Sequence, residues 1–566
     1  MKKQSIKGLA FFAVAGSLVS SCDLLKDLEY TVTPSPLEMH ADSVRVKVDV
    51  KFPEKGIKKK AYAEITPKLA GTSLKTVTVQ GEKATANGTV IQYKPGGTMT
   101  YTDVVAYKPE FEYTELIVTG KVFKGGKEKA GQFEDKEIAK GTIITPYLVN
   151  KDFKCIYAKD EFKRVIEHTA PAQFNYLKAK FDVRKTEYKD TDMVNLGNWL
   201  AAAQSNPKIN IKSINITGYA SPEGEVAKNE TLSSDRANSG KGGMMEVAKK
   251  AKNEKASGEI YNLAGRGEDF DGFKVQLAKN TSIKQEDKDL ILRVLQMYAD
   301  PNQRETEMRN LGKSFTELDK TIFPLLRRAE VSVVYDLTGY SDDELKSISA
   351  SDPQKLTLEE LLFTATLTED LNEKGRLYRE AEKKDPSDFR AANNVGVVLY
   401  NQGKMAEAKS QFEKANGLKD NAISKNNLGA VAGASGDRKK AADLFGQAGG
   451  AGDEVNYNKG ILAIQNGKYA DAVSSFGGTA SFNKALAQLL NGDAAAAIKT
   501  IDDSNDKESG QGYYLKAIAA ARQSKLTDLV SNLKNAIGKD AAWKAKAAKD
   551  REFLKYAEDA SMSFIK

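Results

Sequence analysis

The sequence predicts a multidomain protein with an N-terminal all-β sandwich, a middle α/β domain and a C-terminal all-α solenoid. Apolar and polar residues alternate over residues 44–52, and strands alternate with helical stretches from about residue 174 to 338. A pattern of small and aromatic residues then repeats after residue 390, with its first two copies 33 positions apart. The 566 residues also exceed the roughly 250–300 at which a single hydrophobic core stops growing.

The composition excludes several classes of function. The 85 basic and 77 acidic residues give a net charge of +8, which is too even for a dedicated nucleic-acid binder. The two histidines, His40 and His168, lie far apart, which argues against a histidine-built metal site. The chain lacks a phosphate-binding glycine loop and a G-x-S-x-G motif. We therefore predict no cofactor, no metal, no nucleic-acid partner and no catalytic residue.

The first 22 residues have the features of an export signal. Three lysines before residue 8 precede an apolar run over 9–19, which is shorter than the roughly twenty residues that span a bilayer. The following Leu-Val-Ser-Ser-Cys, residues 18–22, resembles a bacterial lipobox. The resemblance implies removal of residues 1–21 and lipidation of Cys22. The alternative is an ordinary secretory peptide with an incidental cysteine.

Residues 22–150 are predicted to form the β-sandwich. Val44, Val46, Val48, Val50 and Phe52 alternate with polar residues, which is typical of a half-buried strand. Further strands are expected at 62–66, 76–80, 90–93, 101–107, 115–123 and 142–149, with Gly, Pro and Asn between them. The region contains no chemical motif, so we interpret it as a spacer or interaction module.

Residues 151–345 are predicted to form the middle α/β domain. Cys155 lies in an apolar setting near its start, which indicates a buried and unreactive thiol. The expected strands are 181–183, 209–216, 260–263 and 327–334, and the expected helices are 194–203, 229–237, 286–298 and 305–318.

The order of motifs in this region resembles the OmpA-like peptidoglycan-binding domain. The matching residues are Gly218-Tyr219, Asn-x-x-Leu-Ser-x-x-Arg-Ala from Asn229 to Ala237, Gly265-x-Gly267-Glu268 and Arg327-Arg328. The match covers about residues 170–338. It implies an OmpA-like fold for this part of the chain.

The resemblance also implies a binding site for the cell-wall peptide. In the family an aspartate and an arginine hold a diaminopimelate residue, and Arg236 stands at the arginine position, in the same helix motif as Asn229. Ser221 occupies the aspartate position and removes the negative half of this pair. Glu223 could supply a carboxylate if its loop turns inward. The alternative is an OmpA-like fold used as a protein-interaction module, with Arg236 a structural charge.

Residues 355–566 are predicted to form the helical solenoid. The copies share a pattern of small, turn and aromatic residues at recurring positions, which we call marks. The first two copies are offset by 33 positions. The marks are Gly396, Gly403, Ala408, Phe412 and Ala415; Gly429, Gly436, Ala441, Phe445 and Ala448; Gly460, Gly467, Ala472 and Phe476; then Ala485, Gly492, Ala497 and Ile501. Small residues at the first and third marks let two antiparallel helices touch, and the aromatic residue fills the seam.

These copies resemble tetratricopeptide repeats. The resemblance implies a concave surface that binds a protein partner, and a rigid spacer is the alternative. Together the segments predict a lipid-anchored scaffold of the outer membrane, facing the periplasm, that links the membrane to peptidoglycan and recruits a protein through its repeats. An accessory subunit of an outer-membrane assembly or secretion complex, without peptidoglycan binding, is a second hypothesis. An envelope enzyme is a third, which no motif supports.

Overall fold

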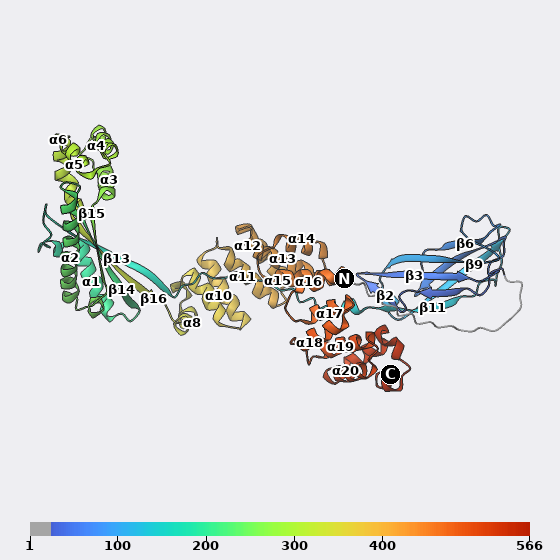
Figure 1. Cartoon of the computed structure of the whole chain (residues 1–566). Helices are drawn as coiled ribbons and strands as arrows, with labels where there is room; N and C mark the ends of the chain where they lie inside the picture. Colours follow the sequence, from blue (N-terminus) through green and yellow to red (C-terminus); the bar gives the residue numbers. More distant parts are fainter. Residues whose placement is uncertain (1–23) are drawn as a thin grey trace. The chain divides into compact units, whose positions relative to one another are not determined.

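The computed structural model describes residues 24–566 and divides them into two compact units. Unit 1 combines residues 24–159 with 370–566, and unit 2 is residues 160–369. The chain therefore leaves the first unit, builds the second, and returns (Figure 1). The predicted signal peptide (1–21) and the predicted lipidation site Cys22 lie outside the described residues.

The N-terminal part of unit 1 contains two β-sheets that share one hydrophobic core. Val44, Val46, Val48, Val50 and Phe52 are at most 3% exposed, which confirms the predicted alternation. The first sheet is ordered β1 (Glu29–Val32), β3 (Ser43–Phe52), β2 (Leu37–His40), β12 (Thr142–Ile143), with β8 (Gly97–Ala106) also on β3. The second is ordered β10 (Lys127–Glu128), β9 (Glu115–Lys124), β4 (Ala61–Leu69), β6 (Val77–Gly81), β7 (Thr89–Ile91), with β11 (Lys136–Lys140) on β9 and β5 (Thr72–Ser73) on β4.

The strand predicted over 142–149 is wrong for most of its length. Only Thr142–Ile143 pairs, in parallel with β2, and a 3-10 turn follows at Thr145–Leu148. Pro146 at the start of that turn has no N–H to offer a sheet, so the strand ends before it.

Unit 2 is built on a four-stranded mixed sheet ordered β13 (Val165–Asn175), β16 (Arg328–Thr338), β14 (Ile209–Ala220), β15 (Tyr261–Glu268). Helices α1 (Thr191–Ser205) and α2 (Val226–Lys250) supply the apolar side chains that pack on it. The strand predicted at 181–183 is wrong, since this stretch has no regular structure. The edge strand is β13 instead, whose Thr, His and Pro residues hide its pattern and whose full length pairs with β16.

An insertion between β15 and β16 forms a small helical layer with its own apolar cluster. The helix predicted at 286–298 is confirmed, whereas the one predicted at 305–318 is split, because the chain turns through Gly312 at a φ of +57°. The helices are α3 (Phe270–Lys279), α4 (Gln285–Met297), α5 (Pro301–Arg309), α6 (Lys313–Thr321) and α7 (Phe323–Leu326). After β16, α8 (Asp342–Ser351) and α9 (Leu358–Thr364) still belong to unit 2, so the beginning of the predicted solenoid lies there.

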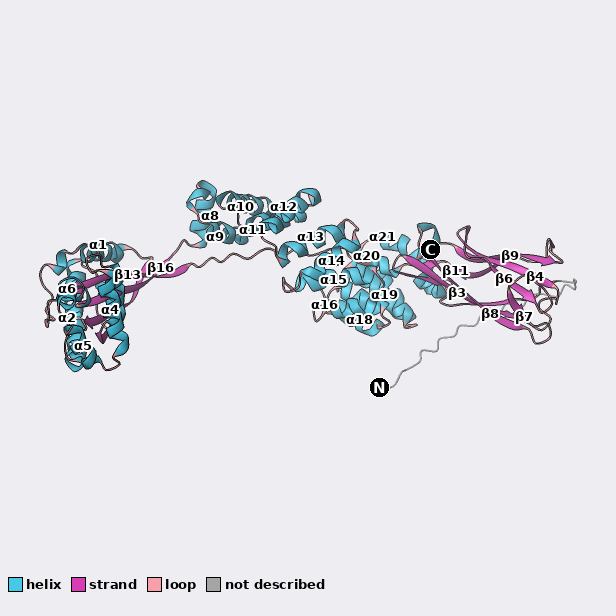
Figure 2. Ribbon diagram, turned by 90° about the horizontal axis from the view of Figure 1, so that it is seen from above, coloured by secondary structure: helices cyan, strands magenta, loops and turns pink. Residues whose placement is uncertain are grey.

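Helices alone build the C-terminal part of unit 1 (Figure 2). α10 (Leu371–Lys384) precedes five antiparallel pairs, and α21 (Ala542–Lys549) follows them. The pairs are α11 (Phe389–Asn401) with α12 (Met405–Leu418), α13 (Ala422–Ala434) with α14 (Arg438–Gln447), α15 (Asp453–Gln465) with α16 (Tyr469–Phe476), α17 (Phe482–Leu490) with α18 (Ala494–Asp502), and α19 (Gly510–Arg522) with α20 (Leu526–Lys539).

The structure confirms the close contact between helices that the repeat pattern predicts. A Cβ built on Gly396, Gly429 or Gly460 would lie 2.6 Å from the aromatic ring of the second helix in the same repeat. The glycine at the first mark therefore leaves the space that the aromatic residue fills. This explains why both residue types recur together in the sequence.

Candidate functional site

The groove formed by the first helices of the repeats holds an extended segment of the chain itself, residues 150–158. Four asparagines, one in each of four consecutive repeats, bind the backbone of this segment through both its N–H and its C=O groups. The N–H and C=O distances are 2.7 and 2.9 Å for Asn394 on Ala158, 2.7 and 2.8 Å for Asn427 on Ile156, 2.7 and 2.8 Å for Asn458 on Lys154, and 2.9 and 2.9 Å for Asn483 on Asn150.

The direction and spacing of these contacts fit an extended peptide antiparallel to the repeat order. The first three asparagines hold every second residue of the segment, so their step along it is about 6.6 Å. The fourth asparagine, Asn483, holds Asn150. Between Asn150 and Lys154, the carboxylate of Asp152 accepts from the hydroxyl of Tyr457 at 2.9 Å. An asparagine side chain offers one donor and one acceptor side by side, which matches a peptide group in an extended chain.

The asparagines form one buried network with two neighbours, Asn393 and Asn426. Both are fully buried and donate to the carbonyls of Ile156 and Lys154 at 3.0 Å. Asn427 donates to Asn393 at 3.0 Å, and Asn458 donates to Asn426 at 3.0 Å. Because a buried polar group without a partner costs about 1–3 kcal/mol, this groove needs a hydrogen-bonding occupant.

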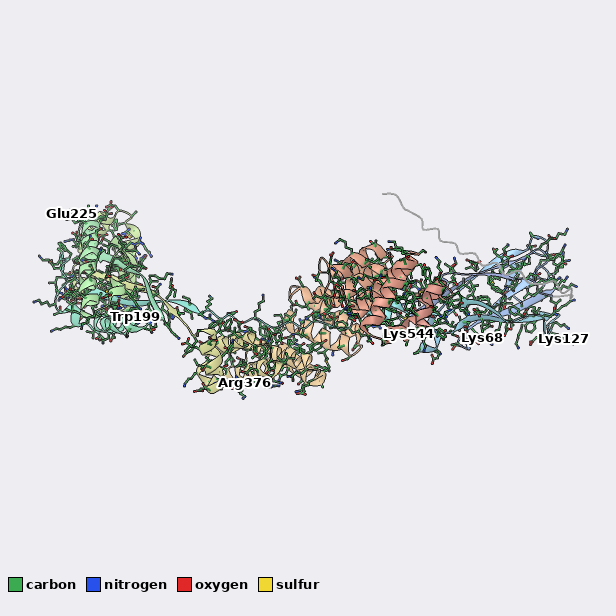
Figure 3. All side chains as sticks on the ribbon, turned by 90° about the horizontal axis from the view of Figure 1, so that it is seen from below. Lys68, Lys127, Trp199, Glu225, Arg376 and Lys544 are labelled. Carbon is green, nitrogen blue, oxygen red and sulfur yellow. The ribbon has the colours of Figure 1, made fainter. Side chains whose placement is uncertain are left out.

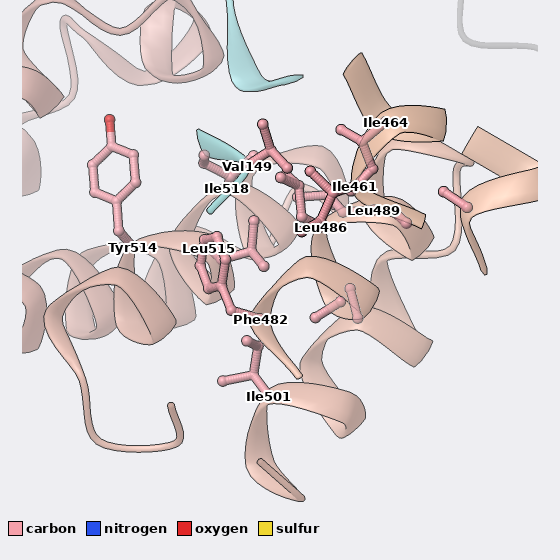
Figure 4. Packing of buried hydrophobic residues seen from close by; sticks show 14 of the residues in the cluster. Val149, Ile461, Ile464, Phe482, Leu486, Leu489, Ile501, Tyr514, Leu515 and Ile518 are labelled. Carbon is pink, nitrogen blue, oxygen red and sulfur yellow. The ribbon is translucent and has the colours of Figure 1, made fainter. Parts of the chain in front are cut away.

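The side chains of the segment add apolar contacts to the backbone contacts. Phe153 is 2% exposed and stacks on Phe445 with ring centroids 6.1 Å apart. A Cβ on Gly433 would lie 2.7 Å from the Phe153 ring, so this glycine makes room for it. Just before the segment, Val149 packs among Ile461, Leu486 and other core residues of the repeats (Figure 4). The segment is therefore part of the core of unit 1.

Cys155 belongs to this segment and not to the α/β domain. Its thiol is free and partly buried, and burial raises its pKa well above the ordinary value. The predicted middle domain began at residue 151, but residues 151–159 lie in unit 1 because the repeats bind them.

Further contacts join the sandwich to the repeats within unit 1. Asp42, at the turn between β2 and β3, accepts from the Arg438 guanidinium at 2.5 and 3.1 Å. His40 lies against Gly467 and Tyr469, with the two ring centroids 5.4 Å apart. Burial, followed by the charge of Arg45, lowers the pKa of His40. The repeats thus hold the sandwich as well as the segment that leaves it.

The residues predicted for cell-wall binding lie in unit 2, where α2 and the loop after β14 meet. Arg236 on α2 is 1% exposed, and its guanidinium donates to the carbonyls of Lys180, Tyr219 and Leu177 at 3.0, 2.8 and 3.2 Å. Burial lowers its pKa to about 10. In this structure Arg236 joins the loop after β13 to the end of β14.

The loop after β14 turns inward and brings Ser221, Glu223 and Asn229 together. The Ser221 hydroxyl donates to Glu223 at 2.8 Å, and Asn229 donates to the Ser221 carbonyl at 3.3 Å and to Glu268 at 2.8 Å. Burial raises the pKa of Glu268. Glu223 is 8% exposed, so the loop carries its carboxylate inward.

Glu223 is already paired with basic residues of unit 2. It accepts two hydrogen bonds from Arg327, one of them at 2.9 Å, and one from Lys178 at 2.8 Å. Asp319, from the inserted helix α6, accepts from Arg327 at 2.8 Å. The insertion therefore contributes a carboxylate to the same ion-pair cluster, and the assignment of this site to peptidoglycan stays a prediction.

The asparagines of the groove were not predicted from the sequence, although the repeat contains a signal for them. Each lies two residues before the first small mark of its repeat: Asn394, Asn427, Asn458 and Asn483 precede Gly396, Gly429, Gly460 and Ala485. The fifth repeat has Leu515 at the equivalent position, so the row of asparagines ends with the fourth repeat. A polar residue that recurs at a fixed place in an otherwise apolar helix indicates a shared ligand.

The described part of the chain offers neither a membrane-crossing helix nor a metal-type cluster. No helix over residues 24–566 is long and apolar enough to cross a membrane. Over the same range no cluster of three or more His, Cys, Asp or Glu side chains has the arrangement of a metal site.

Comparisons with known proteins report similarity to helical-repeat structures. No family model and no curated protein matches the sequence. Similar solved structures include the Cut9–Hcn1 hetero-tetramer (13% identity, 38% of this chain and 45% of that chain, TM-score 0.32) and a tetratricopeptide repeat protein from Parabacteroides merdae (14%, 40% and 90%, 0.28). A third is YrrB, a repeat protein described with an unusual peptide-binding site (18%, 36% and 94%, 0.22). This chain thus spans under half of the Cut9–Hcn1 chain that it matches.

Proposed function

We propose that the protein is a non-enzymatic scaffold whose repeats clamp an extended segment of its own chain and so hold the β-sandwich in place. The observation that supports this proposal is the row of four asparagines, each hydrogen-bonded to both the N–H and the C=O of one residue in segment 150–158. Main-chain contacts of this kind hold a strand whatever its side chains are, and Phe153 adds specificity.

Segment 150–158 is covalently attached to the repeats, which gives it a large advantage in binding over a peptide from another protein. A segment attached nearby has an effective concentration in the millimolar range. A partner peptide present at micromolar concentration would have to bind about a thousand-fold more tightly to replace it, which is about 4 kcal/mol. We therefore propose that a protein partner is recruited through other surfaces of the repeats, while the groove fastens the molecule internally.

Cleaving the chain next to the groove tests the clamp. A site for a sequence-specific protease is introduced between Lys159 and Asp160, where the chain passes from unit 1 to unit 2. After cleavage, fragment 24–159 should remain bound to fragment 160–566 in gel filtration, because residues 150–158 stay in the groove. Separation of the wild-type fragments would contradict the proposal.

The side-chain contribution is tested on the same cleaved protein. The double variant Asn427→Ala, Asn458→Ala should release fragment 24–159 faster than wild type, whereas Asn532→Ala should not, because its amide bonds only to its own helix. If the double variant holds the fragment as tightly as wild type, the contacts of the sandwich carry the attachment and the groove does not.

We further propose that Cys22 is lipidated and anchors this scaffold to the periplasmic face of an outer membrane. The support is the lipobox resemblance of residues 18–22. Crosslinking in cells followed by purification of the tagged chain should recover a specific protein partner. Recovery of a membrane-protein complex would favour the accessory-subunit hypothesis, and repeated purification of the chain alone would contradict recruitment.

Attachment to peptidoglycan is proposed on the resemblance of unit 2 to OmpA-like domains. The full chain should sediment with isolated sacculi. Arg236→Ala should reduce sedimentation, with folding checked by circular dichroism because Arg236 holds three backbone carbonyls. A chain that stays in the supernatant would contradict this part of the proposal.

A further inference from the structure

Lysines from four separate loops lie at one end of the β-sandwich. β3 ends at Phe52 opposite the start of β8, and β4 begins at Ala61 opposite the end of β9, so these strand ends lie at the same end of the two sheets. The end of β6 joins them, because β6 is antiparallel to β4, and β7 runs parallel to β6. The loops 53–60, 82–88, 92–96 and 124–128 therefore meet there.

This lysine-rich end has a strong positive charge. Its loops contain eight lysines and three glutamates, a net charge of +5 (8 − 3). The lysines are Lys55, Lys58, Lys59, Lys60, Lys83, Lys94, Lys124 and Lys127, and the glutamates are Glu54, Glu82 and Glu128. By contrast, the loop 107–114 at the opposite end contains one lysine and two glutamates. Lys127 lies at the lysine-rich end and Lys68 toward the other (Figure 3).

Most of this charge is not neutralised within the protein. Lys55 pairs with Glu54 at 3.1 Å and Lys59 with Glu82 at 2.7 Å, while Glu128 pairs with Lys121 outside the loops. Across the part of the chain that the structure describes, the other six lysines of this end have no carboxylate within 4 Å. The ring of Tyr93 lies near two lysines of this end, with the amino groups of Lys58 and Lys59 at 5.9 and 5.3 Å from its centroid.

The first described residues are fastened to the same end. The backbone N–H of Lys26 donates to Gly56 at 2.8 Å, and that of Lys58 donates to the carbonyl of Leu24 at 3.0 Å. Leu25 bridges to Ile57, and both side chains are buried. Cys22 precedes Leu24 by two residues, so at most about 7 Å of extended chain separates a lipid attached there from this end.

We infer that the lysine-rich end is a binding surface for the anionic phosphate head groups of a membrane. A lipid anchor holds a protein near the bilayer without fixing its orientation, whereas a basic surface next to the anchor would set the sandwich end-on against the head groups. Electrostatic attraction acts within a Debye length of about 8–10 Å, which suits groups only a few residues from the anchor. Tyr93 supplies an amphipathic ring of the kind enriched at membrane interfaces. The inference rests on the proposed membrane anchoring.

Vesicle co-sedimentation tests this surface without the lipid. The chain from residue 24 to 566, which contains every helix and strand described above, is mixed with vesicles of phosphatidylcholine alone or of phosphatidylcholine with phosphatidylglycerol. Binding should require phosphatidylglycerol and should weaken as salt is added. The triple variant Lys60→Ala, Lys94→Ala, Lys127→Ala should bind on the order of a hundred-fold more weakly, because each surface lysine contributes about a factor of five.

A matched triple variant at the other end of the sandwich is the control. Lys68→Ala, Lys75→Ala, Lys108→Ala removes the same charge and should bind like wild type. Equal binding to both vesicle types, an unaffected first variant, or an equal loss in the control would each overturn the inference. Labelling with a radioactive fatty acid, compared between wild type and Cys22→Ala, tests the anchor separately, because the vesicle assay uses protein without lipid.

Discussion

Replacing Asn427 by alanine should open segment 150–158 locally while leaving the repeats folded. The side chain accepts from the N–H of Ile156 at 2.7 Å and donates to its C=O at 2.8 Å. The substitution removes both contacts in the middle of the segment. Alanine is a better helix former than asparagine, so α13 itself should not be weakened.

The free-energy cost follows from the hydrogen bonds that the N–H and C=O groups of Ile156 retain. The carbonyl of Ile156 still accepts from Asn393 at 3.0 Å, so it loses one of two partners, at a cost of about 1 kcal/mol. Its N–H loses the side chain that accepts from it, at a cost of about 1–3 kcal/mol. The sum of about 2–4 kcal/mol corresponds to an increase in local opening of about 30-fold to 1,000-fold, since about 1.4 kcal/mol is a factor of ten.

Hydrogen exchange followed by mass spectrometry measures this opening at the amides of residues 150–158. Asn426→Ala is the matched control, because the carbonyl of Lys154 that it contacts keeps the bond from Asn458 and no segment N–H loses a partner. Asn426→Ala should therefore accelerate exchange far less than Asn427→Ala. If the two variants exchange alike, or if the Ile156 amide is unaffected in the folded protein, the paired hydrogen bonds do not hold the segment.

Three further predictions concern packing, charge and pH. Gly429→Ala should destabilise the repeats by about 1–3 kcal/mol in urea unfolding, because its Cβ would meet an aromatic ring at 2.6 Å, whereas Gly446→Ala, with no atom within 4 Å, should stabilise them by about 0.5–1 kcal/mol. Glu223→Ala should destabilise unit 2 by about 3 kcal/mol because it leaves a buried arginine short of its partner, and Lys178→Ala should cost under about 1 kcal/mol, both followed by tryptophan fluorescence. Because burial lowers the pKa of His40, the stability that it contributes should be complete above about pH 6.5 and be lost as the pH falls below that value, and His40→Gln should flatten this dependence in unfolding measured across pH.

Much of the helical array could be predicted from the sequence because its information is local. The 33-residue offset of the first two copies indicates one helix pair per copy, and the glycine–aromatic pairs indicate how the two helices touch. The alternating valines of β3 likewise determine which side of that strand is buried. Such patterns depend only on the periodicity of helices and strands.

The candidate site in unit 2 was only partly predictable. The sequence placed Ser221, Glu223 and Asn229 on one loop and helix, and the structure brings them together. It did not show that Arg327 and Asp319 share the same cluster, because Arg327 lies just before β16 and Asp319 lies in the insertion between β15 and β16. Pairings between distant elements leave no trace in local periodicity.

By itself the sequence determined the kinds of domain, the repeat register and the helix-to-helix contacts within each repeat. Only the tertiary structure decided that the repeats bind residues 150–158, because each asparagine meets its backbone partner across more than 230 positions of chain. The same long-range contacts place residues 24–159 and 370–566 in one unit although another unit lies between them in the sequence. The physical reason is that an extended segment offers the same peptide groups whatever its side chains are, so its sequence does not reveal what binds it.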